Sequence, residues 1–214
     1  MIAFVARKGG VSKTSLTAHI AVVASASHSV ILVDADPQHS LTDWWNDREA
    51  ATPALMDVPV GHLSRELAKV EGQDGLVMVD TPAFDSGIVA SVIHDADLVV
   101  IPVKPSPHDL RSIAVTVEAV QKAGKPYLFV ITQAVGGASL TTQARTVLAE
   151  SGAVADTVMH NRVAYAGAMT DGRTVQETEP HGKAAVEIAA IYHDIMKSFS
   201  QSVRKSKGSV NHGR

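Results

Sequence analysis

Glycines and lysines gather near the N-terminus, between an apolar run and a segment that can form a helix. The apolar run is Ile2–Ala6, and after it come Arg7-Lys8-Gly9-Gly10-Val11-Ser12-Lys13-Thr14-Ser15. Glycines allow a tight turn whose N–H groups point inward at phosphate oxygens, and the following helix adds its positive end. Lys13 would supply charge for the β- and γ-phosphates, and the Thr14 hydroxyl would contact Mg²⁺. The segment therefore predicts a loop that binds the phosphates of a nucleotide.

Carboxylates follow two further apolar runs. Asp34-Ala35-Asp36-Pro37-Gln38 comes after Val30–Val33, and Asp80-Thr81-Pro82 comes after Leu76–Val79. An aspartate at the end of a strand beside a phosphate loop can hold a water on Mg²⁺, and this is the role predicted for Asp80. The alternatives are structural: Asp80 as the N-cap of a helix, and the 34–38 segment as an ordinary turn.

The elements that must position these residues alternate between short aliphatic runs and longer helical segments. Continuous apolar runs are typical of strands buried on both faces, and they occur at Ile2–Ala6, Val30–Val33, Leu76–Val79, Leu98–Val103 and Tyr127–Ile131. Helices are expected at Lys13–Ser25, Leu41–Glu49, His62–Glu71, Ser86–His94, Asp109–Ala123, Leu140–Glu150 and Gly182–Ser198. This order predicts a single α/β domain, a doubly wound and mainly parallel sheet flanked by helices.

Polar residues follow each predicted strand, and in such sheets ligands bind at the carboxyl ends of the strands. Besides the three segments above, Lys104-Pro105-Ser106-Pro107 follows the fourth run, and Thr132 and Gln133 follow the fifth. We expect these loops to converge on one ligand. Gln133 is placed where the adenine of a bound nucleotide would lie.

The glycine loop departs from the common phosphate-loop pattern in an informative way. Arg7 and Ser12 stand where that pattern has glycines, and an additional lysine, Lys8, precedes Lys13 by five residues. The resulting pattern x-K-G-G-x-x-K-[TS] resembles the deviant Walker A loop of the ParA/MinD family of ATPases. The resemblance implies that residues 8–15 bind ATP with Mg²⁺, that Lys13 is catalytic, and that Thr14 contacts the metal.

The resemblance also implies roles for three aspartates and for Lys8. Asp34-Ala35-Asp36-Pro37-Gln38 looks like the family's Walker A′ motif, in which Asp36 positions or activates the attacking water. By the same resemblance, Asp34 and Asp80 lie near the metal and contact it through water. Lys8 would be catalytic from across a dimer interface, where it contacts the phosphates of the partner's nucleotide, as an arginine finger does. The implied assembly is an ATP-dependent homodimer.

Segments beyond the loops are similar to the small ParF-type plasmid-partition ParA proteins. They include Ser40-Leu41-Thr42-Asp43-Trp44, Pro105-Ser106-Pro107-His108-Asp109 and Asn161-Arg162-Val163-Ala164-Tyr165. The resemblance implies a cytoplasmic, nucleoid-associated DNA-partition ATPase that a ParB-like or ParG-like centromere-binding protein stimulates. Non-specific contacts to double-stranded DNA are expected from Arg162, Arg173, Lys183 and Lys197.

The composition of the chain excludes several kinds of site. The chain has 214 residues, 45% of them hydrophobic, a net charge of −3 and no cysteine, which excludes disulfides and thiolate metal sites. No apolar stretch is long enough to span a membrane. The ten histidines show no ligand spacing, so a transition-metal site is not expected. We divide the chain into an ATPase domain, residues 1–198, and a basic, flexible tail, residues 199–214.

Four other functions compete with DNA partition. A MinD-like membrane-cycling ATPase would need an amphipathic C-terminal helix that inserts into lipid, and Ile191–Val203 has apolar residues at suitable positions. A small-molecule kinase would need an acceptor pocket that the sequence does not reveal, and the lack of cysteine argues against a metallocluster carrier. A catalytically silent scaffold would not need Lys13, Thr14, Asp36 and Asp80 together.

Overall fold

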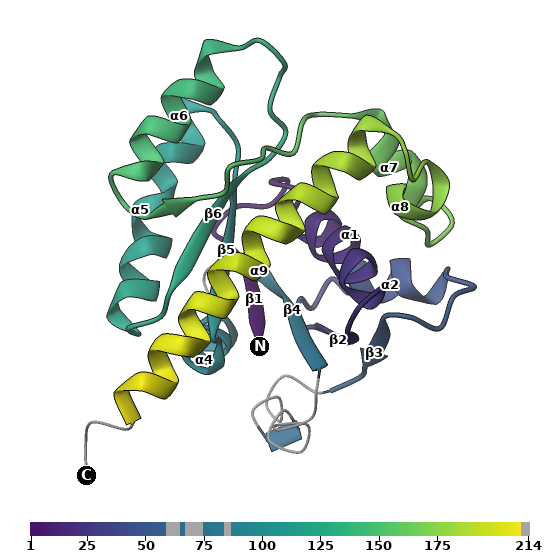
Figure 1. The fold of residues 1–214 in the computed structure, drawn as a ribbon, viewed down its shortest axis with the longest axis horizontal. Helices are drawn as coiled ribbons and strands as arrows, with labels where there is room; N and C mark the ends of the chain where they lie inside the picture. The colour runs from purple at the N-terminus through teal and green to yellow at the C-terminus, as the bar shows by residue number, and fades with distance from the viewer. Residues whose placement is uncertain (59–64, 67–74, 84–86, 211–214) are drawn as a thin grey trace.

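The computed structural model describes residues 1–58, 65–66, 75–83 and 87–210, which form a sheet covered by helices on both faces (Figure 1). Seven strands pair in the order β3-β2-β4-β1-β5-β6-β7, and every pair is parallel. The strands are β1 (Ile2–Ala6), β2 (Ser29–Asp34), β3 (Ala54–Met56), β4 (Gly75–Ala83), β5 (Leu98–Val103), β6 (Tyr127–Ile131) and β7 (Ala153–Val154). The predicted fold class is confirmed.

The helices fall into two layers. They are α1 (Lys13–Ser25), α2 (Ser40–Asn46), α4 (Gly87–Asp95), α5 (Pro107–Lys122), α6 (Ser139–Ala149), α7 (Val163–Met169), α8 (Val175–Thr178) and α9 (Lys183–Val210). One core joins the sheet to α1, α2, α7, α8 and α9, and the other joins it to α4, α5 and α6. Figure 1 shows α9 crossing the first of these faces beside α1.

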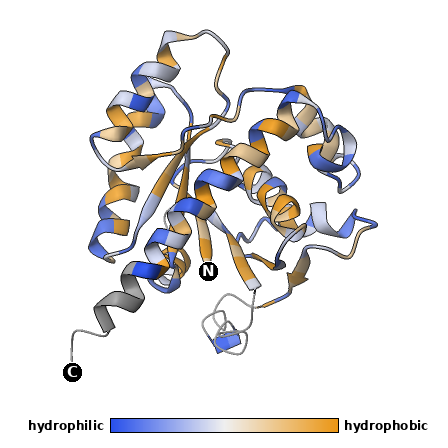
Figure 2. Cartoon of the chain, in the orientation of Figure 1, coloured by the Kyte–Doolittle hydropathy of each residue, from blue (hydrophilic) through white to orange (hydrophobic). Residues whose placement is uncertain are grey.

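Strand β1 shows why the central strands are apolar throughout. Ile2 and Phe4 belong to the core under α1 and α9, whereas Ala3 and Val5 belong to the core under α4 and α5. Successive side chains of a strand point to opposite faces, so a strand between two helical layers has no side for polar residues. Figure 2 shows the same concentration of hydrophobic residues along the strands and on α1.

The predicted boundaries of β1, β5, β6 and α1 agree with the structure, and several other elements were missed or differ in length. The missed elements are the short ones, β3, β7, α7 and α8. The closing helix was expected to end at Ser198 but continues to Val210, so the first part of the predicted flexible tail is helical. The helix expected over 62–71 lies largely outside the described residues. In the described part of the chain, no helix is long and apolar enough to cross a membrane.

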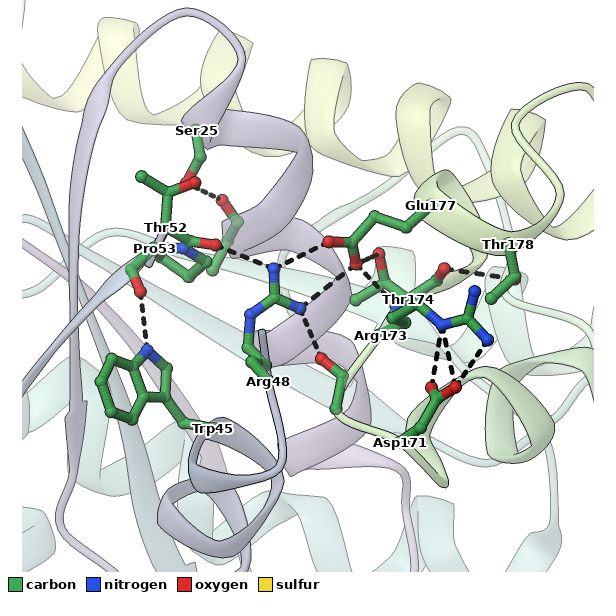
Figure 3. A network of polar contacts seen from close by, with 12 residues as sticks. Ser25, Trp45, Arg48, Thr52, Pro53, Asp171, Arg173, Thr174, Glu177 and Thr178 are labelled. Carbon is green, nitrogen blue, oxygen red and sulfur yellow. Dashed lines mark hydrogen bonds and ion pairs between the residues drawn. The ribbon is translucent and has the colours of Figure 1, made fainter. Parts of the chain in front are cut away.

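A polar network fastens α2, which follows the Asp36 loop, to the α7–α8 connection (Figure 3). Arg48 donates to the Gly172 carbonyl at 2.5 Å, to the Thr52 carbonyl at 2.8 Å and to Glu177 at 2.8 Å. Its guanidinium lies 4.8 Å from the ring centroid of Trp44. Gly172 has φ +73°, and a Cβ there would lie 2.4 Å from the backbone nitrogen of Arg48, so only glycine fits.

Glu177 also completes the capping box of α8 with Thr174. Burial alone would raise the pKa of Glu177, but hydrogen bonds from Arg48 and Thr174 bring it below its ordinary value. The carboxylate therefore stays charged and paired at neutral pH. Through Arg48 and Glu177, the segment that follows α2 is held against α8 and the α7–α8 connection.

Candidate nucleotide site

The glycine loop connects the end of β1 to the start of α1 at the carboxyl edge of the sheet. Two of its residues have left-handed backbone, Gly10 with φ +73° and Ser12 with φ 60°. This conformation is free of strain for glycine but costs a residue with a Cβ of order 1–3 kcal/mol. Ser12 precedes the first residue of α1, yet its side chain does not cap that helix. The Ser12 hydroxyl instead accepts a hydrogen bond from Gln133.

Lys13 and Thr14 both contact Asp80, which the parallel pairing of β1 and β4 places opposite Phe4. Lys13 Nζ lies 2.7 Å from Asp80 Oδ1, and Thr14 Oγ1 donates to Asp80 Oδ2 at 2.6 Å. Burial raises the pKa of the Asp80 carboxyl, and the Lys13 ammonium and the Thr14 hydroxyl counteract that rise. One buried carboxylate thus holds both the predicted phosphate-binding lysine and the predicted metal-binding hydroxyl.

The two aspartates after β2 differ in their surroundings. Asp34 accepts hydrogen bonds from the backbone N–H of Asp36 at 3.1 Å, and from the N–H and hydroxyl of Thr42 at 2.9 and 3.0 Å. It lies beside Asp80 in the β2–β4 register. Asp36 is half-buried, and its Oδ1 accepts from the Gln38 N–H at 3.0 Å. Asp34 therefore supports the start of α2 with both carboxylate oxygens, whereas the Asp36 carboxylate accepts a local hydrogen bond from Gln38.

These residues fit a magnesium ion. Mg²⁺ takes oxygen ligands in an octahedron and keeps several of its waters. The Thr14 hydroxyl and the carboxylates of Asp80 and Asp34 offer such oxygens at neighbouring strand ends. When bound, the ion would supply positive charge that offsets the negative charge developing on the phosphates during transfer. The assignment of these three residues to the metal stays a prediction.

Lys8 contacts a different part of the molecule from Lys13. Its ammonium donates to the His108 carbonyl at 3.1 Å and lies 3.6 Å from Asp109 Oδ1, in the first turn of α5. Asp109 also accepts from Ser106, the N-cap of that helix. In this single chain Lys13 therefore contacts Asp80, whereas Lys8 contacts Asp109 at the start of α5.

The end of β6 lies directly against the glycine loop. Gln133 Nε2 donates to the Gly10 carbonyl at 2.7 Å and to the Ser12 hydroxyl at 2.8 Å. Thr132, which the sequence analysis did not select as a site residue, donates from Oγ1 to the Val11 carbonyl at 2.9 Å. Its position between a buried strand and Gln133 was the available signal. The hydrogen bonds of Gln133 are made to the loop, whereas the sequence predicted a contact with adenine.

A cavity of about 510 Å³ opens beside Ser12, Ser15 and Gln133, and Arg162 and Tyr165 line its other side. Arg162 forms an ion pair with Glu187 of α9, which also accepts from Tyr165 at 2.9 Å. The cavity is large enough for the base and sugar of a nucleotide whose phosphates lie in the loop. Arg162 thus lies at the edge of the cavity beside the glycine loop.

The four residues predicted to contact DNA do not have equal surroundings. Arg162 and Arg173 are each paired with a carboxylate, Glu187 and Asp171 respectively. Lys183 and Lys197 are exposed on α9. An arginine whose charge is matched by its own chain attracts a phosphate backbone less strongly, so the structure favours the two lysines as phosphate contacts. DNA binding by these residues stays a prediction.

His19 makes the fold sensitive to acid. It lies one turn after Ser15 in α1, fully buried, with Nδ1 2.7 Å from the Ser15 carbonyl and its ring against Tyr165. Burial lowers its pKa from 6.5 to about 4. Between these values the unfolded chain binds a proton that the folded chain does not, so stability falls as the pH falls. From pH 7 to pH 5 the expected loss is about 2 kcal/mol.

Urea unfolding at pH 7, 6 and 5 measures this loss. His19→Gln should flatten the pH dependence by about 2 kcal/mol, whereas His181→Gln, at an exposed position, should leave it unchanged. Equal slopes for the wild type and His19→Gln would show that this histidine is not the sensitive group.

Comparison with known proteins agrees with the geometry. The model of the CobQ/CobB/MinD/ParA nucleotide binding domain matches residues 2–175. The maintenance of carboxysome distribution protein A (McdA) of Gloeobacter kilaueensis is 34% identical over 212 residues, 96% of each chain. Protein ParA of Rhizobium radiobacter is 26% identical over 213 residues, 92% of this chain and 96% of that protein.

A solved structure shares the fold. The ATP complex of an McdA variant from Cyanothece superimposes with a TM-score of 0.77 at 15% identity, covering 93% of this chain and 95% of that one. At this identity the likeness concerns the fold alone. The family model covers most of the chain, and its residues 2–175 include the glycine loop, both aspartate segments and Gln133. The chain therefore belongs to the CobQ/CobB/MinD/ParA family and is a nucleotide-binding ATPase of the ParA/MinD type.

Proposed function

We propose that this protein is a partition-type positioning ATPase. Mg-ATP brings two copies together, the dimer binds double-stranded DNA without sequence preference, and a cargo-bound partner of the ParB or ParG kind stimulates hydrolysis and releases it. ATP and ADP states then differ in their affinity for DNA, and hydrolysis moves the population between them. The protein would act in the cytoplasm, on the nucleoid.

The observation that supports dimerisation most directly is the position of Lys8. Lys13 already provides the cation at Asp80, and the Lys8 ammonium contacts the first turn of α5. A lysine held there is available to a second chain once Asp109 releases it. A cation supplied in trans stabilises charge on the transferring phosphoryl group and joins the subunits only while the triphosphate is present.

Two kinds of cargo are candidates, DNA and a protein compartment. The McdA relative is named for the distribution of carboxysomes, whereas the resemblance of the sequence motifs to plasmid-partition ParA proteins supports DNA as cargo. Because the identity to McdA is higher than that to the ParA relative over a similar length, a protein compartment is a specific second candidate. The proposed ATP-dependent dimer would position either cargo in the same way.

Membrane cycling is less favoured. Ile188, Ile191 and Ile195 of α9 are fully buried in the core shared with α1. Residues that pack against the sheet cannot insert into lipid without opening the fold. Flotation with anionic liposomes and ATP tests this alternative, which requires the protein to float with the vesicles.

The proposed function predicts an ATP-dependent dimer that is lost in Lys8→Ala. Size-exclusion chromatography with ATP and with ADP measures the dimer, and ATP hydrolysis with and without non-specific duplex DNA measures its activity. Binding to DNA should weaken steeply with salt. Lys122→Ala, at the exposed end of α5, is the matched control. Fast, DNA-independent turnover by a monomer that tolerates Lys8→Ala would refute the proposal.

A further inference from the structure

Two successive residues at the end of β6 take up three successive acceptors of the glycine loop. Gln133 Nε2 donates to the carbonyl of Gly10 and the hydroxyl of Ser12, at 2.7 and 2.8 Å. Thr132 Oγ1 donates to the carbonyl of Val11 at 2.9 Å. The loop is thus fastened from outside, by residues more than 100 positions away in the chain.

The direction of these carbonyls decides the direction of the loop's N–H groups. In a planar trans peptide, the C=O of one residue and the N–H of the next point to opposite sides. The Gly10 carbonyl is turned toward Gln133, so the Val11 N–H is turned away from β6. The Val11 carbonyl is turned toward Thr132, so the Ser12 N–H is also turned away from β6. Phosphate oxygens need N–H groups and are repelled by carbonyls. Contacts from β6 therefore favour the phosphate-binding arrangement.

The contact between Gln133 and Ser12 is the second part of this arrangement. Its backbone is left-handed, and its hydroxyl does not cap α1. The hydroxyl instead accepts from Gln133, whose own φ is 52°. Because the Gly10 carbonyl can only accept, the amide nitrogen must face the loop and the orientation of the Gln133 amide is fixed.

We propose that Gln133 is a positioning residue for phosphate binding: it holds the glycine loop open to phosphate through Gly10 and Ser12, and it compensates for the serine that stands at a glycine position. Its effect on the nucleotide is exerted through the loop and not through a contact with the base. The inference concerns the ATPase site itself and does not depend on the cargo or on DNA.

A probe without a base separates the two roles. Binding of Mg-tripolyphosphate and of Mg-ATP is measured by displacement of a fluorescent ADP analogue from the wild type and Gln133→Ala. We expect both ligands to bind about tenfold more weakly to the variant, with kcat at saturating ATP within about twofold of the wild type. A loss for ATP with unchanged tripolyphosphate binding would overturn the proposal in favour of a base contact.

The compensation for Ser12 is tested by a double-mutant cycle. Ser12→Gly removes both the strained residue and its hydroxyl, so Gln133→Ala should weaken tripolyphosphate binding less in that background than in the wild type. An equal loss in both backgrounds would refute the part played by Ser12.

Gln121→Ala is the control for the loss of a glutamine side chain. It removes another Nε2 contact, 3.0 Å from the Tyr127 hydroxyl, and should leave binding unchanged. If Gln133→Ala fails to fold, Gln133→Leu retains the bulk of the side chain for the same measurement.

Discussion

Replacing Lys13 with methionine is expected to abolish ATP hydrolysis and to destabilise the fold at the same time. Lys13 Nζ lies 2.7 Å from Asp80 Oδ1, and these side chains are only 8% and 1% exposed. Removing one partner of a buried ion pair leaves the other charge uncompensated, which costs about 3–5 kcal/mol. It also removes the charge that Lys13 would supply to the phosphates, so we expect activity to fall to about 1% or less.

A second substitution separates these two effects. Adding Asp80→Asn to Lys13→Met removes the unpaired charge, so the double variant should regain most of the lost unfolding free energy while ATP hydrolysis stays absent. Urea unfolding and phosphate release measure the two quantities, with Lys122→Met, at an exposed position, as the control. A double variant no more stable than Lys13→Met would contradict the ion-pair argument.

The sequence was most informative where function and fold depend on the same local pattern. The boundaries of β1 and α1 were predicted correctly because the glycine loop separates a strand from a helix within a few residues. The meeting of Asp34 and Asp80 followed from the rule that parallel strands end at one edge, and the register pairs these residues directly. Short elements such as β3 and α8 are too short to show a period.

Contacts between distant segments could not be predicted in the same way. The sequence placed Gln133 at the site but could not show that its amide is directed to the loop, because this depends on a left-handed backbone and on partners far away in the chain. The ion pair between Arg162 and Glu187 could not be predicted either, because it depends on how α9 packs in the fold. The pairing of Arg173 with Asp171, two residues away, could have been suspected from the spacing alone.

Asp36→Asn is expected to slow ATP hydrolysis about 10²–10⁴-fold, the usual contribution of a general base. The ATP dissociation constant should change by no more than about threefold, since the carboxylate is not expected to contact phosphate. Asparagine keeps an oxygen for the Gln38 N–H, which Asp36 accepts at 3.0 Å, so the loop should retain its shape. Single-turnover hydrolysis and equilibrium binding of a fluorescent ATP analogue measure the two quantities separately.

Asp34→Asn provides the contrast, because the structure uses both of its carboxylate oxygens. One oxygen accepts from Asp36 and the other from Thr42, and an asparagine can keep only one of these acceptors. Asp34→Asn should therefore weaken the start of α2 and lower stability and ATP binding together, whereas Asp36→Asn should affect the chemical step alone. If Asp36→Asn also lost ATP binding, the residue would hold the nucleotide, and activation of the attacking water would have to come from another group.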